Sequence, residues 1–285
     1  MGRANPHSLG GWETNRHAYP LEPRAMGLVD GEAWVARANW DRVEVRDENG
    51  ALRFEHTIPP AMGDGLLHGF AFVGAHLACA LGNGLTAYGL RVWDLHTGEA
   101  VMDLATGDVN GRYLLSSPPG SSLVLVGDPE CVAVWDVPLR RRLRTFALGD
   151  VLEGAFEPAS GRLACGDFAL LRVHDPSGAP LVSWSVEGDV ETLAWGGEGS
   201  LLVSTTTRGA AQVWRAEDGS LVAGLEAVGD ILASSPCGRW IAFEDGVTDL
   251  DALTVRRAVA RAAVFDPASA SFVVADADRI WRIPV

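Results

Sequence analysis

The sequence contains no lysine, and all 23 of its basic residues are arginine. Without lysine the chain has no residue for a Schiff base, for a phosphate-binding P-loop or for lysine general-base catalysis. It also has no run of 18 or more apolar residues, which excludes a membrane-spanning helix. No apolar stretch stands near its first residue, so we expect no secretory signal.

Positive charge and cysteine are both scarce. The 285 residues carry a net charge of −14, which argues against direct contact with nucleic acid because phosphates require a basic surface. None of the four cysteines stands at C-x-x-C spacing, so neither a zinc knuckle nor a redox pair is predicted. Cys79 and Cys165 lie in the similar contexts "HLACAL" and "RLACG", which are typical of a core. We expect reduced thiols and a cytoplasmic protein.

Motifs of catalysis are missing too. The sequence has no G-x-S-x-G, H-E-x-x-H or P-loop pattern, and its seven histidines show no metal-ligand spacing. "GNGLTA" (82–87) matches a dinucleotide fingerprint, but a strand pattern follows where that motif needs a helix. The acidic clusters 244–251 and 276–279 lack the spacing of a calcium loop and are interpreted as solvated turns. We therefore predict no catalytic residues, no cofactor and no metal.

What the sequence does contain is a repeat of about forty residues, built from short apolar runs between turn residues. No segment keeps a 3.6-residue apolar period, so almost no helix is expected. The clearest copies are "VEVRDENGALRF" (43–54), "VWDLHTGEAVMDL" (92–104), "VWDVPLRRRLRTF" (134–146), "VHDPSGAPLVSW" (173–184) and "VWRAEDGSLVAGL" (213–225), with weaker copies at 250–259 and 280–285. Third strands are predicted to end near Asp47, Asp94, Asp136, Asp175, Arg215, Asp251 and Arg282.

These residues resemble the WD-repeat family, through the "VWD" that ends a third strand and through turns such as "SSPPG" (116–120) and "SSPCG" (234–238). The resemblance covers nearly the whole chain. It implies an all-β fold, a single domain (1–285) forming a seven-bladed β-propeller of four-stranded antiparallel blades. The family's Gly-His pair and its turn aspartate are absent, so no ligand-binding residue is carried over.

Closure of the ring gives a further expectation. The last unit ends at Val285 with its third strand, which would leave an open edge. A segment at 11–21 precedes the first unit and has the length of the missing strand. As in the family that the chain resembles, we expect residues 1–20 to supply an N-terminal strand to the last blade, pairing near Arg279–Ile283.

A Gly-Asp pair precedes the first strand of five consecutive units at intervals of 39 to 44 residues. In a propeller this corner lies near the mouth of the central channel. Turn chemistry favours Gly-Asp, but Asn or Ser would serve equally well and would avoid repulsion between charges. We therefore hypothesise an acidic ring that attracts a cationic partner segment, formed by Asp64, Asp108, Asp150, Asp189 and Asp230.

The run "LRRRLR" (139–144) is a basic island on an acidic chain. It follows "VWDV" and should lie on an exposed outer strand. Charges at such an edge protect it from pairing with other sheets. The alternative is a rim patch that docks an acidic partner, formed by Arg140, Arg141, Arg142 and Arg144.

The sequence thus favours a non-catalytic interaction scaffold, a docking subunit whose partners are other proteins rather than nucleic acid or membrane. Two alternatives stay open. The first is an enzyme or metal-binding propeller that uses the acidic ring. The second is a structural subunit that uses the Arg-rich rim.

Overall fold

A computed structural model describes residues 22–39, 42–57, 66–82, 86–110, 115–116, 121–127, 131–148, 151, 153–208, 211–225, 229–276 and 279–285. These residues form β-strands joined by short turns, with one 3₁₀ turn at Gly197–Gly199. The expectation of almost no helix is confirmed. Within the same residues, no helix is long and apolar enough to cross a membrane.

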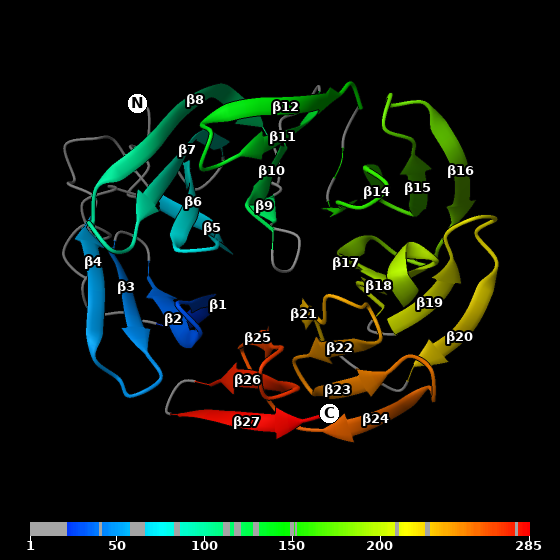
Figure 1. The fold of residues 1–285 in the computed structure, drawn as a ribbon. Coiled ribbons are helices and arrows are strands. Elements are labelled where there is room, and N and C mark those ends of the chain that lie inside the picture. The colour runs from blue at the N-terminus through cyan, green and yellow to red at the C-terminus, as the bar shows by residue number, and fades with distance from the viewer. Residues whose placement is uncertain are drawn as a thin grey trace, which may run out of the picture.

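The strands form seven antiparallel sheets arranged around a central axis (Figure 1). Six sheets have four strands, and the last has three strands among the described residues. Each sheet follows chain order from the axis to the rim, and the first and last sheets are neighbours in the ring (Figure 1). The fold is a seven-bladed β-propeller, as the repeat predicts.

The two inner strands of each blade begin and end as follows. The first strands are β1 (Glu22–Val29), β5 (Leu66–Val73), β9 (Leu115–Ser116), β13 (Glu153–Glu157), β17 (Val190–Gly196), β21 (Ile231–Ser234) and β25 (Ala262–Asp266). The second strands are β2 (Glu32–Ala38), β6 (His76–Gly82), β10 (Leu123–Gly127), β14 (Arg162–Gly166), β18 (Leu201–Thr206), β22 (Trp240–Phe243) and β26 (Ser271–Ala275).

The outer strands complete the blades. The third strands are β3 (Arg42–Asp47), β7 (Thr86–Asp94), β11 (Val132–Asp136), β15 (Leu170–His174), β19 (Ala211–Arg215), β23 (Gly246–Asp249) and β27 (Ile280–Pro284). The fourth strands are β4 (Leu52–Thr57), β8 (Ala100–Asn110), β12 (Arg141–Phe146), β16 (Pro180–Ser185), β20 (Leu221–Leu225) and β24 (Thr254–Arg257).

The hydrophobic core consists of seven layers, one between each pair of neighbouring blades. Trp93 and Trp214 are buried in such layers, and the half-buried Trp135 packs against another. The prediction that these tryptophans pack between blades is therefore confirmed. Cys79 and Cys165 are buried as well, and burial raises the pKa of the Cys165 thiol to about 12, so this thiol stays protonated.

The aspartates that end third strands shape the turns that follow. In "VWDLHTGEA", Asp94 Oδ1 accepts hydrogen bonds from the N–H groups of His96 (2.8 Å) and Thr97 (3.0 Å). Gly98 closes the turn with a φ of 74°, a conformation that suits glycine. The stretch recurs because each copy ends the third strand of a blade and begins the turn to the fourth strand, which lies at the rim.

In blade 6, the third strand ends two residues before Asp251, near which the sequence predicts its end. β23 ends at Asp249, whose Oδ1 accepts a hydrogen bond from the Asp251 N–H at 3.0 Å. Asp249 also forms an ion pair with Arg239 at 2.8 Å. Asp249 therefore has the capping role, and Asp251 lies in the turn.

These capping carboxylates predict loss of stability in acid. The hydrogen bond from the Thr97 N–H lowers the pKa of Asp94, and the hydrogen bond from Arg239 lowers the pKa of Asp249. A pKa that is lower in the folded state gives stability above the unfolded pKa, and this stability is lost as pH falls through the folded pKa. We expect the Tm to fall steeply below about pH 4, and less steeply in Asp94→Asn. Circular dichroism melts between pH 7 and pH 3 test this, and an unchanged Tm would contradict it.

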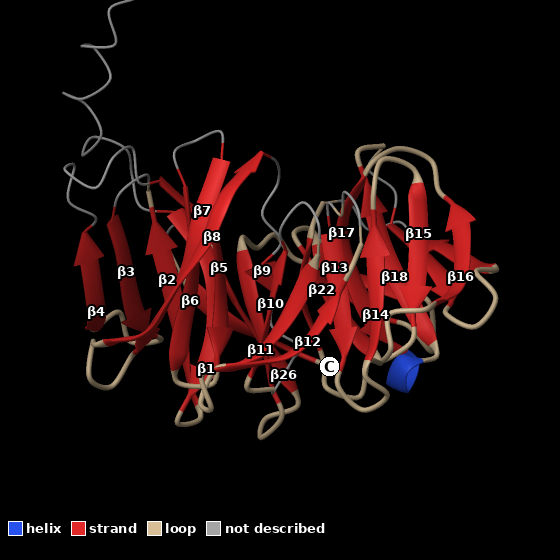
Figure 2. Ribbon diagram, turned by 90° about the horizontal axis from the view of Figure 1, so that it is seen from above, coloured by secondary structure: helices blue, strands red, loops and turns tan. Residues whose placement is uncertain are grey.

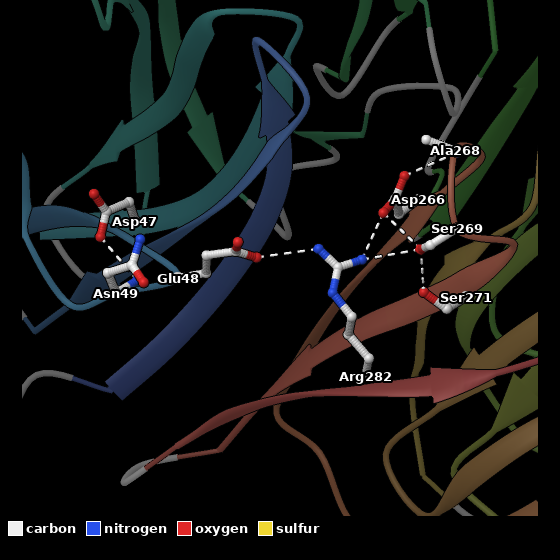
Figure 3. A network of polar contacts seen from close by, with 8 residues as sticks. All are labelled: Asp47, Glu48, Asn49, Asp266, Ala268, Ser269, Ser271 and Arg282. Atoms are coloured by element: carbon white, nitrogen blue, oxygen red, sulfur yellow. Dashed lines mark hydrogen bonds and ion pairs between the residues drawn. The ribbon is translucent and has the colours of Figure 1, made fainter.

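Blades 7 and 1 meet through a polar network as well as an apolar layer (Figure 3). Arg282 on β27 bonds to Glu48, in the turn after β3, at 3.1 Å. Its other guanidinium nitrogen pairs with Asp266 at 2.5 Å and donates to Ser269 Oγ at 3.0 Å. The predicted N-terminal strand at 11–20 lies outside the described residues, so its pairing with β27 stays a prediction.

Candidate binding surface at the channel mouth

The propeller has two faces, which carry different connections between strands. Because each blade is an antiparallel meander, the first–second and third–fourth turns share one face, which we call the turn face. The second–third loops and the links between blades share the opposite face, which we call the link face. Figure 2 shows the strands crossing the thickness of the disc, with the 3₁₀ turn Gly197–Gly199 on the turn face.

The first strands surround a central cavity of about 440 Å³. Small side chains recur on its wall, as at Ala155, Ala194 and Ala233, because the strands converge there. Gly27 is required by this crowding, since a Cβ on it would stand 2.3 Å from the Phe72 ring. A second hollow of about 400 Å³ opens toward the turn face and is largely apolar, with Leu28, Leu232, Phe265, Pro236 and Pro267 in its wall.

The Gly-Asp corners of blades 5 and 6 lie on the link face. Gly188 and Gly229 have φ values of 89° and 93°, which explains glycine at both positions. The Asp189 N–H donates to Thr207 Oγ1 at 3.1 Å, and the Asp230 carbonyl accepts from the Glu244 N–H at 3.0 Å. The backbone of each corner is thus held by a hydrogen bond to the second–third loop of its own blade.

The carboxylates of these two corners do not cap their own turns. Among the described residues, no hydrogen bond joins the carboxylate of Asp189 or Asp230 to a neighbouring group. The aspartates of the third–fourth turns behave differently, since Asp47, Asp94 and Asp175 each accept two backbone N–H groups. Turn capping therefore explains the aspartates on the turn face but not these two on the link face.

Asp230 belongs to an acidic group that we call the acidic junction, formed with Glu191 on β17 and Glu244 after β22. Partial burial raises the pKa of Asp230, and repulsion from Glu244 and then Glu191 raises it further. Arg261 lies 3.4 Å from Glu244, which balances part of this charge. The junction lies between blades 5 and 6, where the Ile231 N–H also donates to Thr192 Oγ1 at 3.0 Å.

Repulsion in the acidic junction predicts that Asp230→Asn stabilises the fold. Because the pKa of Asp230 is higher in the folded state, ionisation costs stability as pH rises, and the variant avoids that cost at neutral pH. We expect a Tm higher by on the order of 1–2 °C at pH 7, with the difference vanishing below about pH 4. Asp218→Asn is the matched control with the opposite sign, because a hydrogen bond from Ser220 lowers the pKa of Asp218. A lower Tm for Asp230→Asn at pH 7 would contradict the prediction.

The structure describes no side chain for the other three aspartates of the hypothesised ring. Asp64 and Asp150 lie outside the described residues. Asp108 lies within β8, in a bulge opposite the step from Ala87 to Gly89, and its side chain is not described. The expectation of a link corner at Gly107-Asp108 is wrong, because the long strand β7 continues to pair with β8 as far as Asn110.

Glu191 was not singled out in the sequence, and Glu244 was noted only as the first residue of the cluster 244–251, which was interpreted as a solvated turn although Gly246–Asp249 forms the buried strand β23. They stand outside the Gly-Asp pair, one on a first strand and one after a second strand of the next blade. The sequence contains a partial signal for Glu244. A propeller places the second–third loop, where Glu244 lies, beside the link of the same blade, where Asp230 lies. Among the described residues, no group of three or more His, Cys, Asp or Glu side chains has the arrangement of a metal site.

The arginines of the predicted rim patch lie together on the outer edge of blade 3. Arg141, Arg142 and Arg144 belong to β12, and Arg140 precedes it with a φ of 50°. Arg144 reaches the neighbouring blade, where it donates to the Gly161 carbonyl at 3.1 Å. This patch is on the rim, away from the channel that the first strands line.

Comparison with known proteins supports the fold and does not identify a function. No protein-family model matches the chain, and no curated protein sequence matches it. The chain is similar to one in a solved structure described as "Crystal Structure of Mitotic Checkpoint Complex", with a TM-score of 0.67 and 17% identity over 93% of this chain and 87% of that chain. The shared feature is the fold. Because 1468 chains of solved structures match, this similarity does not select a function.

Proposed function

We propose that this protein is a non-catalytic interaction scaffold, a divergent WD-repeat-like propeller that docks other proteins as a subunit of a cytoplasmic complex. The "VWD" strand ends with capping aspartates and the tryptophans packed between blades support the family assignment. The similar solved chain comes from a structure described as a complex, which fits a role in assembly.

The finer proposal is that the link face near the channel mouth receives a cationic segment of a partner, bearing Arg or Lys. The observation that carries it is the acidic junction, where partial burial and repulsion from Glu244 and Glu191 raise the pKa of Asp230, so that keeping the three acids ionised opposes folding and costs stability. Proteins keep such costs at functional sites more readily than elsewhere. Carboxylates around an opening between low-dielectric walls also concentrate a negative potential, which speeds encounter with a cation.

The test begins with the partner. The tagged full-length chain is purified from its native cells, and the proteins that accompany it are identified. The affinity of the main partner is then measured for a link-face variant that combines Asp189→Asn, Glu191→Gln and Asp230→Asn. A charge-matched control combines Glu99→Gln, Glu217→Gln and Asp218→Asn, three exposed acids in turns of the turn face.

We expect the link-face variant to bind about tenfold more weakly or worse and to lose salt dependence, while the control keeps both. Unchanged affinity and unchanged salt dependence in the link-face variant would overturn the cationic-segment proposal.

The competing function is an enzyme or metal-binding propeller with its site at the same mouth. It requires acids that hold a cation or exchange protons. Calorimetry with Ca²⁺, Mg²⁺ and Zn²⁺ separates the two: the scaffold predicts no saturable heat, and a one-site isotherm lost in the link-face variant favours the alternative.

A further inference from the structure

The outer strand of blade 3 differs from the other outer strands in how its charges are balanced. Arg53 on β4 pairs with Asp47, and Glu55 pairs with Arg42 at 3.0 Å. On β8, Asp103 pairs with Arg91 at 2.5 Å. On β24, Arg257 pairs with Asp245 and Arg256 donates to the Pro284 carbonyl at 2.7 Å. β16 and β20 carry no charged residue.

On β12 and in the turn before it, three consecutive arginines lack such partners. Arg140, Arg141 and Arg142 are exposed, and no acidic side chain among the described residues forms an ion pair with them. In a chain with a net charge of −14 and 37 acidic residues, this cluster is an exception. Its charge is therefore available to a group outside the protein.

Two exposed leucines flank the three arginines that lack an acidic partner among the described residues. Leu139 is 59% exposed and Leu143 is 41% exposed, so a leucine stands on each side of the three arginines. Other outer strands also expose leucines, as at Leu52, Leu181 and Leu221, so β12 is distinguished by having them beside arginines without an acidic partner in the described part of the chain. The backbone itself is ordinary, since the bulge opposite Trp135 has counterparts between the third and fourth strands of blades 1, 2, 4 and 5.

We infer that β12 is a docking site for an extended acidic segment of another protein, one that carries apolar residues between its carboxylates. Its acids pair with Arg140, Arg141 and Arg142, and its apolar side chains cover Leu139 and Leu143. Arginine suits this role because its planar guanidinium binds a carboxylate through two parallel hydrogen bonds. Aliphatic contacts beside the charges add the area that exposed ion pairs lack.

The acidic balance of the whole chain favours a short peptide over a larger polyanion. A nucleic acid or an anionic membrane extends far beyond one strand and would meet the repulsion of the other acidic surfaces. A short segment contacts only the rim. The inference assumes, with the proposed function, that the chain binds proteins, but it uses a different surface from the link face.

The probe is a fluorescently labelled eight-residue peptide of alternating Glu and Leu, titrated against the full-length protein and followed by anisotropy. Peptides of alternating Lys and Leu and of alternating Glu and Ser, and a short DNA duplex, are titrated in parallel. The rim variant combines Arg140→Gln, Arg141→Gln and Arg142→Gln. Its charge-matched control combines Arg208→Gln, Arg215→Gln and Arg256→Gln, exposed arginines of other blades.

We expect the Glu-Leu peptide to bind the protein, with affinity reduced about tenfold in the rim variant and unchanged in the control. Weaker binding of the Glu-Ser peptide supports the role of the leucines. The link-face variant should keep the affinity, so failure of the cationic-segment proposal would leave this one standing.

Four results would overturn the inference. They are no binding of the Glu-Leu peptide up to about 1 mM, equal affinity in the rim variant, equal binding of the Lys-Leu peptide, and equal or tighter binding of the DNA duplex. Sedimentation of the protein alone gives a further outcome: self-association that disappears in the rim variant would assign β12 to contacts between copies of this chain.

Discussion

Replacing Trp93 with alanine is expected to lower the free energy of unfolding by about 3–5 kcal/mol, as for other buried aromatic residues. Trp93 is only 2% exposed and lies in the layer between blades 1 and 2. Its ring stands 5.6 Å from the Phe54 ring and 5.0 Å from the His56 ring, both on the outer strand of blade 1. The truncation therefore removes contacts that join two blades, and it takes a large share of the stability of a typical domain.

Trp135 provides the internal control, because it occupies the same repeat position but remains partly exposed. Trp135→Ala should cost clearly less, about 1–3 kcal/mol. Chemical denaturation of the three proteins, with equal m-values as the condition for comparison, measures both differences. An unchanged midpoint for Trp93→Ala, or a larger loss for Trp135→Ala, would show that this position does not serve the core.

The sequence assigned these tryptophans to one structural position but could not rank them. The "VWD" triplet predicts where the third strand ends and which side chain faces the neighbouring blade. The aspartate caps the turn, and side chains alternate between the two faces of a strand. How deeply each ring is covered depends on the neighbouring blade, which the triplet does not report. His174 illustrates this dependence: it takes the tryptophan position in blade 4 and is buried, with its Nδ1 3.2 Å from the Gly178 carbonyl.

The fold could be predicted because its signal repeats. Each blade on its own shows only short apolar runs, but seven in register leave few alternatives to a ring. The structure differs from the average repeat where a blade departs from its copies: Asp249 caps the turn in which Asp251 lies, and β8 extends through Gly107-Asp108. In both cases local hydrogen bonding decided the boundary, which the average repeat does not contain.

The candidate surface was predictable only in part, for a related reason. The repeated Gly-Asp pair marks the link corner, and the backbone of Gly188 and Gly229 accounts for the glycines. The charge that surrounds Asp230 comes from Glu191 and Glu244, which lie on different elements and obey no spacing with it. In the same way, the sequence shows the basic island at 139–144, but only the structure shows which arginines lack an acidic partner.

Among the described residues, the layer between blades 7 and 1 consists of smaller side chains than the layer between blades 1 and 2. Its buried residues are Met26, Ala33, Val35, Ala262, Val273 and Ala275, whereas the layer between blades 1 and 2 contains two tryptophans and a phenylalanine. Small side chains bury less apolar area, so this layer contributes less to closure. The Arg282 network adds a polar link (Figure 3), and Arg282 itself is 40% exposed, which limits what an ion pair supplies there.

Deletion of residues 1–20 is therefore expected to destabilise the entire propeller. Among the described residues β27 pairs only with β26, and the sequence predicts that a strand within 11–20 pairs with the opposite edge of β27. Losing that strand would expose an edge beside the layer between blades 7 and 1, whose described side chains are small. We expect a loss of several kcal/mol, on the order of the stability of a domain, and increased aggregation through the open edge.

Two further proteins make this deletion interpretable. Deletion of residues 1–9 removes only what precedes the predicted strand and should leave the Tm unchanged. A synthetic peptide of residues 10–20, added to the protein that lacks 1–20, should restore the Tm in proportion to its concentration, because a ligand of the folded state stabilises it by mass action. Arg282→Ala should weaken closure by a smaller amount, since it leaves β27 paired. Full-length Tm in the longer deletion, or no response to the peptide, would show that blades 7 and 1 close the ring through the Arg282 network and their apolar layer alone.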